Sequence, residues 1–453
     1  MPKLSDIPVC PDPPAARLST GVTKEYQISL VTPLFGGGVE AGMPDESLPI
    51  RGTSIRGQLR FWWRIVIGRR FGAQMWQREE EVFGSTEFPS PLDIRILEQP
   101  NVVKVDPTYG ERYGPIAYAL FSAVENEQQV MKEGGAFRLQ LTWPDRAELE
   151  NRRKAQNARR KADSKQRLPD TVDDIELDII AAFRAWCAFG GIGARTRRGC
   201  GAIFCRDFTS ELPALDGAIL VAAPRSSALE AWKKSLKAYR DFRQSPRGRL
   251  HQKTLRSGKT RRVPGRSHWP EADSVRGITG SALNPGSRAS MPHVPADENP
   301  NDHSVPIVPH EILPAFPRAV LGLPINFHFA DGPGKNRPGQ PNSDPQDVQL
   351  IPVAADGKDG DRMSSPVITR PIWLHGKWHP GVIILHEQLP NDLLLRLTGR
   401  RARSDGTDLS FNLPFDRIVA SALGKLRPMR GKASALDALH DLLKANGFHE
   451  ITR

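Results

Sequence analysis

The stretch RGTSIRGQLRFWWRIVIGRRFG, residues 51–72, predicts an α-helix whose two sides differ in chemistry. Its apolar residues recur at the spacing that puts them on one side, and they are Ile55, Leu59, Trp62, Trp63 and Val66. Three arginines four residues apart form a second side, and they are Arg56, Arg60 and Arg64. We expect the helix to run from about residue 53 to about residue 70, with Thr53 or Ser54 capping its N-terminus.

The two sides of this helix allow different interpretations. Aromatic residues beside each other on an apolar side are typical of a helix that packs on a sheet, so we expect Trp62 and Trp63 to lie in the core. The arginines form either a solvated face or a surface that contacts phosphates, because guanidinium groups suit phosphate oxygens. The helix taken alone leaves both interpretations of the arginines open.

The segments around this helix predict a ferredoxin-like fold. Alternating or β-rich residues predict strands over 25–35, 92–99, 137–143 and 201–208, and a second helix is predicted over 172–190. The resulting order is β-α-β-β-α-β, the pattern of a split βαβ unit with helices on one face of an antiparallel sheet. The fold class is therefore α+β.

The rest of the chain predicts a second, distorted copy of the same unit. We expect a strand from about residue 218, a helix over 227–242, later strands over 324–330 and 366–389, and a closing helix over 434–447. The predicted organisation is an N-terminal extension (1–21), an N-terminal domain (22–213) and a C-terminal domain (214–453). Insertions rich in basic residues or in Pro and Gly are predicted over 144–171, 237–266, 281–306 and 331–361.

Charge and composition narrow the function. The chain has 453 residues with 63 Lys and Arg against 51 Asp and Glu, a net charge of +12, which favours nucleic acid or an anionic membrane surface as partner. No apolar run approaches the roughly 18 residues that span a bilayer, and the N-terminus lacks the apolar region of a secretory signal. Four cysteines are too few for a disulfide framework in a chain of this length, so we expect a reducing, cytoplasmic setting without a membrane.

The glycine-rich stretch GGIGARTRRGCG, residues 190–201, resembles two nucleotide-binding motifs in its glycine content but matches neither of them. Thr196 stands where the dinucleotide motif needs its third glycine, and no Lys-Ser or Lys-Thr follows for a phosphate loop. What remains is a loop with flexible backbone that carries Arg195, Arg197 and Arg198, either a solvated basic loop or a phosphate contact. In a ferredoxin-like sheet the first and fourth strands are neighbours, so this loop and the arginine helix are expected near one sheet edge.

The segments LPIRGTSIRGQLRFWWR (48–64) and GGIGARTRRGCGAI (190–203) together resemble the RAMP superfamily of CRISPR proteins. More narrowly, they resemble the first RAMP subunit, the head subunit, of the type III-B effector complex. Three further segments are similar to the same subunit, and they are GRSHWPEADSVR (265–276), FPRAVLGLPINF (316–327) and RMSSPVITRP (362–371).

This resemblance implies tandem ferredoxin-like, RRM-like RAMP domains and a non-catalytic, RNA-binding assembly subunit in antiviral defence. Such a subunit would hold the 3′ part of the guide RNA, engage target RNA and contact other RAMP subunits, without a cofactor. The RNA-binding positions that the resemblance implies are Arg51, Arg56, Arg60, Gly191, Gly193, Arg195, Arg197, Arg198, Arg266, Trp269, Arg276 and Arg318.

An endoribonuclease is the alternative function. Backbone subunits of such complexes are expected to cleave with an aspartate in the loop between the first strand and first helix, where this chain has Asp45. His251 and His268 flank the basic stretch and offer a general base. No metal is expected, because the cysteines lack the spacing of a zinc site and the pair His375 and His379 lies in a turn pattern.

Overall fold

Two four-stranded antiparallel sheets with the same strand order carry the N-terminal and C-terminal parts of the chain. The computed structural model describes residues 21–38, 40, 42–162, 172, 174–209, 211–244, 251–254, 260–263, 268–279, 314–328, 347–353, 360, 362–386, 392–397, 410–414, 424 and 426–451. In each unit a helix follows the first strand of the sheet and another helix follows the third strand, as in a β-α-β-β-α-β chain.

The N-terminal unit follows the predicted order. Its sheet has the order β2-β5-β1-β6 with antiparallel neighbours. The elements in chain order are β1 (Val22–Leu30), α1 (Gly52–Val66), β2 (Asp93–Glu98), β5 (Ala136–Trp143), α6 (Glu176–Phe189) and β6 (Ile203–Cys205). This is the ferredoxin-like arrangement, and the sequence-based prediction for this part of the chain is confirmed.

Smaller elements fill the connections of this unit. They are η2 (Gly68–Gln74), α2 (Met75–Phe83), β3 (Lys104–Val105), α3 (Pro115–Ala119), α4 (Phe121–Glu125), β4 (Val130–Met131), α5 (Arg146–Ala162), η3 (Thr196–Arg198) and η4 (Arg206–Phe208). The basic stretch 151–167, predicted as an insertion, enters α5, where Arg153 is 4% exposed and bonds Glu81 at 2.7 Å. One arginine of this stretch is thus part of the folded interior rather than of a solvated loop.

The C-terminal unit repeats the arrangement with long insertions. Its sheet has the order β12-β13-β7-β16, which is the same permutation of the chain order as in the N-terminal unit. The elements are β7 (Gly217–Ala222), α7 (Ala228–Gln244), β12 (Val367–Leu374), β13 (Lys377–Leu385), α11 (Ala435–Ala445) and β16 (Phe448–Glu450). The predicted domain boundary between 213 and 214 falls between η4 and β7.

A third four-stranded sheet, order β10-β11-β14-β15, is inserted into the C-terminal unit and was not predicted. Its strands are β10 (Ile325–Phe327), β11 (Val348–Val353), β14 (Asp392–Leu397) and β15 (Ser410–Pro414). The other inserted elements are β8 (His251–Thr254), β9 (Thr260–Val263), α8 (Glu271–Thr279), η6 (Pro317–Leu321) and η8 (Arg427–Met429). Strand β11 lies inside the stretch 331–361 that was predicted as a loop, and residues 237–244 of the predicted insertion 237–266 belong to α7.

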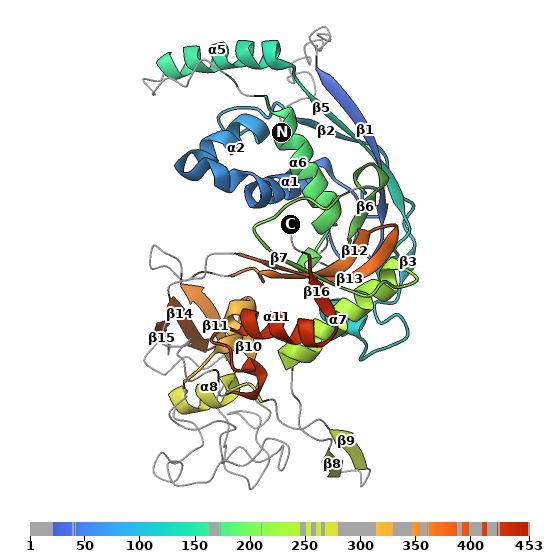
Figure 1. Ribbon diagram of the computed structural model, residues 1–453, viewed down its shortest axis with the longest axis vertical. Coiled ribbons are helices and arrows are strands. Elements are labelled where there is room, and N and C mark those ends of the chain that lie inside the picture. The colour runs from blue at the N-terminus through green and yellow to red at the C-terminus, as the bar shows by residue number, and fades with distance from the viewer. Residues whose placement is uncertain are drawn as a thin grey trace, which may run out of the picture.

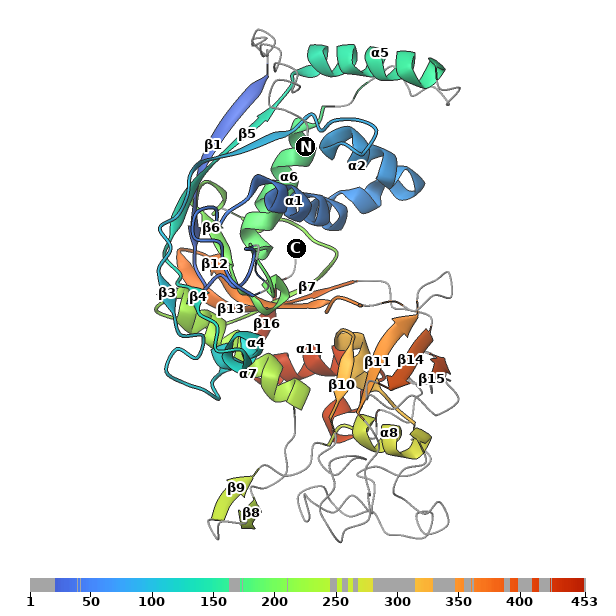
Figure 2. The ribbon, with the colours of Figure 1, turned by 180° about the vertical axis from the view of Figure 1, so that it is seen from behind.

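The helices lie on one face of the N-terminal sheet, and the second sheet is covered on both faces. In Figures 1 and 2, α1, α2 and α6 lie inside the curve of the N-terminal sheet, whereas α7 and α11 lie below the second sheet. The upper face of the second sheet shares one apolar core with the N-terminal unit through Ile219, Val221, Ile368, Ile372, Ile383 and Leu385. The two units therefore pack as one body through a common core.

Helix α1 anchors to this core through the side that the sequence predicted. Trp62 and Trp63 are 2% and 0% exposed, and Nε1 of Trp63 donates a hydrogen bond to Asp178 at 2.6 Å. The predicted start at about residue 53 is confirmed to within one residue, but the predicted side-chain cap and the predicted end near residue 70 were wrong. The helix starts at Gly52 with Arg51 as N-cap, without a side-chain cap, and ends at Val66, beyond which the chain turns into η2.

Candidate nucleic-acid interface

The arginines of α1 bond backbone carbonyls of the same unit. Arg56 Nη2 donates to the carbonyl of Leu92 at 3.0 Å, just before β2. Arg60 Nη2 donates to the carbonyls of Phe83, at 3.2 Å, and Gly84, where α2 ends. A helix end leaves carbonyls without an intrahelical partner, and a cation is well suited to them. These arginines therefore tie α1 to α2 and to β2.

The third arginine of α1 bonds a buried carboxylate. Arg64 Nε and Nη2 donate to the two carboxylate oxygens of Glu79 at 2.5 and 2.7 Å. Glu79 on α2 is 4% exposed, and the guanidinium of Arg64 also lies 5.0 Å from the ring centroid of Trp76. The three arginines therefore have structural contacts within the unit while keeping partial exposure, and their contact with RNA stays a prediction. The hypothesis that they form a separate, solvated side with no structural task is wrong.

The loop before α1 holds Asp45 in a network of hydrogen bonds. Its carboxylate accepts from the backbone N–H and the hydroxyl of Ser47, from the N–H of Leu48 and, at 2.7 Å, from Arg51. The bond from Leu48, followed by those from Ser47 and Arg51, lowers the pKa of Asp45 well below its usual range. Asp45 is thus an ionised carboxylate that shapes its own loop.

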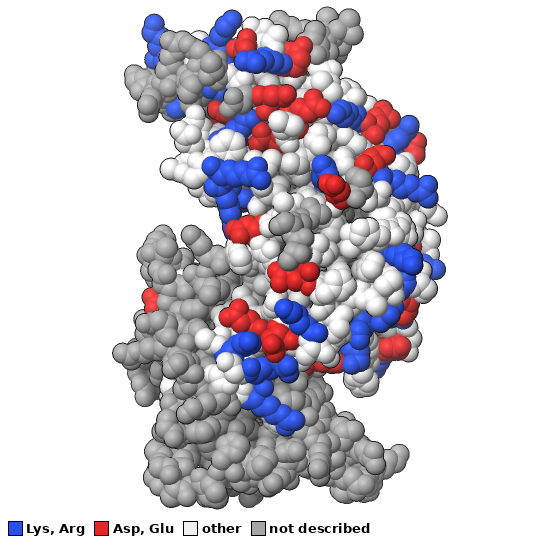
Figure 3. All heavy atoms as spheres, viewed as in Figure 1, with Lys and Arg blue, Asp and Glu red and all other residues white. Residues whose placement is uncertain are grey.

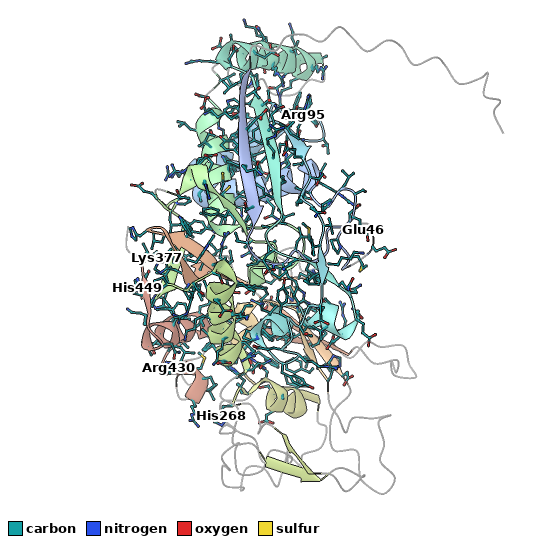
Figure 4. The ribbon with its side chains drawn as sticks, turned by 90° about the vertical axis from the view of Figure 1, so that its right-hand side faces the viewer. Glu46, Arg95, His268, Lys377, Arg430 and His449 are labelled. Atoms are coloured by element: carbon teal, nitrogen blue, oxygen red, sulfur yellow. The ribbon has the colours of Figure 1, made fainter. Side chains whose placement is uncertain are left out.

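The candidate acid–base residues do not share one site. In Figure 4, Glu46, the neighbour of Asp45, lies far from His268, at the right-hand side at mid-height, whereas His268 lies near the lower end of the drawn side chains. His251 lies at the start of β8, and His379 Nδ1 lies 2.9 Å from the carbonyl of Ala222 inside the second sheet. Among the described residues, no cluster of three or more His, Cys, Asp or Glu has the geometry to hold a metal ion.

The glycine-rich loop follows α6 and passes between the two units. Gly191 pairs with Ala202 as an isolated bridge, and Gly193 adopts φ +81° with no room for a side chain against the carbonyl of Phe35. Gly199 adopts φ +77°, and a Cβ there would lie 2.1 Å from the carbonyl of Thr369 in the second unit. The glycines are required because the backbone approaches other backbone closely.

The arginines of the loop also bind within the chain. Arg195 Nη1 donates to the carbonyl of Ala119 at 3.1 Å, and its guanidinium lies 4.1 Å from the ring centroid of Phe121. Arg197 Nη1 donates to the carbonyl of Ser365 at 2.8 Å. Burial lowers the pKa of Arg195, and all three loop arginines keep partial exposure. Their first task is therefore to join the loop to its surroundings.

Arg198 faces a buried tyrosine of the second unit. Its guanidinium lies 4.5 Å from the ring centroid of Tyr239 on α7, which is 0% exposed. Burial raises the pKa of Tyr239, but the guanidiniums of Arg198 and Arg243 outweigh this effect and lower it to about 8. The carbonyl of Arg198 also accepts a hydrogen bond from Trp232 at 2.7 Å. Arg198 is consequently part of the contact between the loop and α7.

A residue that the sequence analysis missed joins the same junction. Arg370 on β12 is 2% exposed, and its guanidinium donates to the carbonyls of Gly190 at 2.6 Å, Ile203 at 2.9 Å and Cys187 at 3.3 Å. Burial lowers its pKa to about 9, which keeps it protonated at neutral pH. Its signal in the sequence is a lone charge in the apolar strand VITRPIWL, which requires a buried partner.

The predicted positions of the second half are mostly structural. Trp269 is 2% exposed and donates from Nε1 to the carbonyl of Phe242 at 3.2 Å, so its ring lies in the core, and a contact with RNA stays a prediction. Arg318 Nε lies 3.0 Å from the buried carboxylate of Glu271. Arg276 lies on α8, and Arg266 lies outside the described residues.

The visible charge distribution is mixed. Figure 3 shows lysine and arginine side chains interspersed with acidic ones over the N-terminal unit, and many of them form ion pairs. None of the described helices combines the length and the apolarity that a membrane crossing requires. The excess positive charge of the chain is therefore not spread evenly over the face of the N-terminal unit that Figure 3 shows.

The family comparison falls on the segment that contains α1 and the glycine-rich loop. The model of the RAMP superfamily matches residues 27–204, from within β1 into β6. Among solved structures, the chain is similar to Cmr1 from Pyrococcus furiosus in the apo form. The identity is 13% and the TM-score 0.40, over 87% of this chain and 94% of that chain.

Two further solved structures have lower scores. A chain of the type III-B Cmr-beta complex bound to cognate target RNA has 14% identity and a TM-score of 0.24, over 41% of this chain and 59% of that chain. The same complex with target RNA, AMPPnP and ssDNA gives 14% identity and a TM-score of 0.24, over 40% and 54%. The comparison with curated proteins gives no match.

Proposed function

We propose that this chain is an RNA-binding and assembly subunit at the head of a type III-B CRISPR effector complex, in the cytoplasm. In this role it holds the 3′ part of the guide RNA, engages target RNA during antiviral defence and contacts other RAMP subunits. It is non-catalytic and uses no cofactor.

The observation that carries the proposal is the RAMP superfamily match over residues 27–204. That segment contains both motifs of the resemblance, the helix α1 and the glycine-rich loop, in one ferredoxin-like unit. The net charge of +12 supports a polyanionic partner, because cationic surfaces raise the affinity for nucleic acid through counterion release. The repeated strand order of the second unit fits a tandem RAMP architecture.

The contacts of the glycine-rich loop suggest how RNA binding and assembly are coupled. The loop arginines bond to both units, so the loop fixes the angle between the two sheets. Any RNA path that crosses both units therefore depends on this junction. The partial exposure of Arg195, Arg197 and Arg198 leaves room for a phosphate contact at the outer edge of the loop, which stays a prediction.

The chemistry of Asp45 supports the non-catalytic role. Its carboxylate accepts four hydrogen bonds from the loop and from Arg51, which leaves little capacity for a metal ion or an attacking water. With purified chain and magnesium, we expect guide-like RNA to stay intact. Cleavage that disappears in Asp45→Asn would contradict this part of the proposal and support the endoribonuclease alternative.

The proposal is tested by co-expressing the tagged full chain with the products of its neighbouring genes. We expect a stable complex that carries RNA with a repeat-derived sequence at one end. A chain that purifies alone and free of RNA under low-salt conditions, where electrostatic binding is strongest, would overturn it.

A further inference from the structure

We propose that single-stranded RNA crosses this chain over an exposed surface formed by α7 and the loop 106–114, with bases stacked on Tyr113. This surface borders the glycine-rich loop at Phe121, whose ring lies 4.1 Å from the guanidinium of Arg195, but none of the residues of α7 and the loop 106–114 belongs to the motifs of the resemblance. The inference rests on the proposed function in one respect, that the chain binds RNA.

The aromatic side chain at the centre of this surface is held out in solvent. Tyr113 is 90% exposed. Among the exposed large hydrophobic side chains of the described residues, it has the highest exposed fraction. Its backbone is fixed, because its carbonyl accepts a hydrogen bond from Arg240 Nη1 at 3.0 Å. An aromatic ring kept out of the core on a fixed backbone is available to stack on a base.

The loop that carries Tyr113 is itself well ordered. Asp106 accepts from the N–H of Thr108 at 2.7 Å, and the hydroxyl of Tyr109 donates to Glu133 at 2.5 Å. Glu111 and Gly114 close consecutive turns, with their N–H groups bonded at 3.0 and 2.7 Å. The following helix α3 contacts α7. The exposure of Tyr113 is thus a built feature of the loop.

Two depressions flank Tyr113 and differ in charge. The aromatic depression, about 780 Å³, is lined by Tyr113, Tyr118 and Phe121, with its two cations matched by two carboxylates. The lysine depression, about 680 Å³, has two carboxylates, Glu111 and Glu230, against six cations. Those cations are Arg112, Arg225, Lys233, Lys234, Lys237 and Arg240.

This division fits a single strand of nucleic acid better than other polyanions. Bases suit the aromatic side, and the phosphate backbone suits the side lined by six cations and two carboxylates; Arg112 and Arg240 lie between the two sides and line both. Phe121 is 47% exposed and carries the guanidinium of Arg195 at 4.1 Å, which extends the stacking surface. A duplex would keep its bases from the exposed rings.

The sequence beyond α7 continues the same charge. Residues 237–266 contain eleven Lys and Arg against one Asp, and they begin in the last two turns of α7. The end of α7 that leads into this stretch, with Arg240 and Gln244, lines the aromatic depression beside Tyr113, whereas the lysines line the other depression along the preceding turns of α7.

The test measures the affinity of the full chain for a fluorescent, mixed-sequence single-stranded RNA by anisotropy. Tyr113→Ala is expected to weaken binding about 5- to 100-fold, the loss of one stacked base, whereas Tyr113→Phe retains it. Trp76→Ala is the matched control, because Trp76 is 62% exposed on α2 and should bind as wild type does.

Charge reversal tests the phosphate side. Arg112→Glu with Lys234→Glu should flatten the slope of log affinity against log salt by about 1.4, since each single-strand phosphate contact contributes about 0.7. Arg95→Glu with Arg146→Glu is the control with the same change in net charge, at side chains that are 69% and 71% exposed elsewhere. Equal effects of both pairs would mean that net charge alone matters and would overturn the inference.

The outcomes separate the inference from the proposed function. If wild type binds RNA and Tyr113→Ala binds equally well, the RNA path is elsewhere and only the inference falls. If Tyr113→Ala keeps RNA but no longer assembles with the other subunits, the surface is a protein contact and the inference is also overturned. If wild type binds no RNA at all, the proposed function itself fails.

Discussion

Replacing Arg370 by Met should uncouple the two units of the fold. The guanidinium of Arg370 donates to the buried carbonyls of Cys187, Gly190 and Ile203, which belong to the end of α6 and to β6. Methionine fills a similar volume but donates no hydrogen bond. The variant therefore leaves three buried acceptors without the partner that the second unit supplies.

The magnitude follows from two opposing effects. A buried acceptor left without a donor costs about 1–3 kcal/mol, so three acceptors at the middle of that range cost about 6 kcal/mol. Removing a buried cation relieves its desolvation, which offsets several kcal/mol of this loss. The net destabilisation is about 3 kcal/mol, a large part of the roughly 5–15 kcal/mol that typically separates folded from unfolded protein.

The assay is urea denaturation followed by tryptophan fluorescence, which reports on both units. Because the units share one apolar core, we expect one transition in wild type and an earlier, broader or split transition in Arg370→Met. Arg370→Lys keeps the charge but not the planar fork and should lie between the two. Arg95→Met, at a side chain that is 69% exposed, is the control and should change stability by less than about 1 kcal/mol.

A result for Arg370→Met within about 1 kcal/mol of wild type would refute this reasoning. It would mean that the three carbonyls find other donors, such as water entering the junction. If Arg370→Met is less stable than wild type but still unfolds in one sharp transition, the predicted loss of stability holds and the predicted uncoupling of the two units is refuted. The junction would then be no weaker than the rest of the core.

Two further perturbations test the contacts around α1 and the glycine-rich loop. Arg56→Ala with Arg60→Ala should lower the free energy of unfolding by about 1–3 kcal/mol, because partly buried charged hydrogen bonds to carbonyls are lost; an unchanged denaturation midpoint would contradict this. Tyr239 should ionise at about pH 8 in a tyrosinate absorbance titration, and this early step should vanish in Tyr239→Phe and move upward in Arg198→Ala. Because its folded-state pKa lies below the ordinary value of 10.0, the stabilisation is complete above about pH 10 and is lost as pH falls through about 8. A titration without an early step, or stability that falls from pH 8 to pH 10 more in wild type than in Tyr239→Phe, would contradict the assigned sign.

The sequence predicted the ferredoxin-like order because that order depends on local periodicity. Alternation in β1 and β5 and the apolar side of α1 are visible within about ten residues, and the tryptophans lie where that spacing puts them. The repeat of the strand order in the second unit was also predicted, although long insertions separate its strands. The third sheet was missed because β10 and β11, and likewise β14 and β15, are short and far apart along the chain.

The tasks of the arginines could not be predicted in the same way. The partners of Arg56, Arg60 and Arg64 are a carboxylate and carbonyls that lie 15 to 36 residues away, and no pattern in the sequence identifies a backbone carbonyl as an acceptor. Trp269 was expected to meet RNA, but its ring fills the core beside Phe242. A side chain with both an apolar body and a polar end is compatible with either place until the fold is known.

The exposed ring of Tyr113 was missed for the opposite reason. The two tyrosines of the polar stretch 106–114, Tyr109 and Tyr113, carry no periodic signal, and only the fold brings Tyr113 beside the lysines of α7. The basic stretch 237–266 was predicted to be an insertion, although its first residues, 237–244, belong to α7. Local sequence patterns cannot identify a binding surface that is formed by segments far apart in the chain.

The most direct test of the account is ultraviolet crosslinking of the full chain to single-stranded guide-like RNA, followed by mass spectrometry of the RNA-bound peptides. The account predicts crosslinks in residues 112–125, which include Tyr113 and Phe121, and along α7, all suppressed by high salt. Crosslinks confined to α2, α5 or the outer face of β2 would contradict the proposed path. The absence of any crosslink above the level of a protein that does not bind RNA would contradict the central claim that this chain is an RNA-binding subunit.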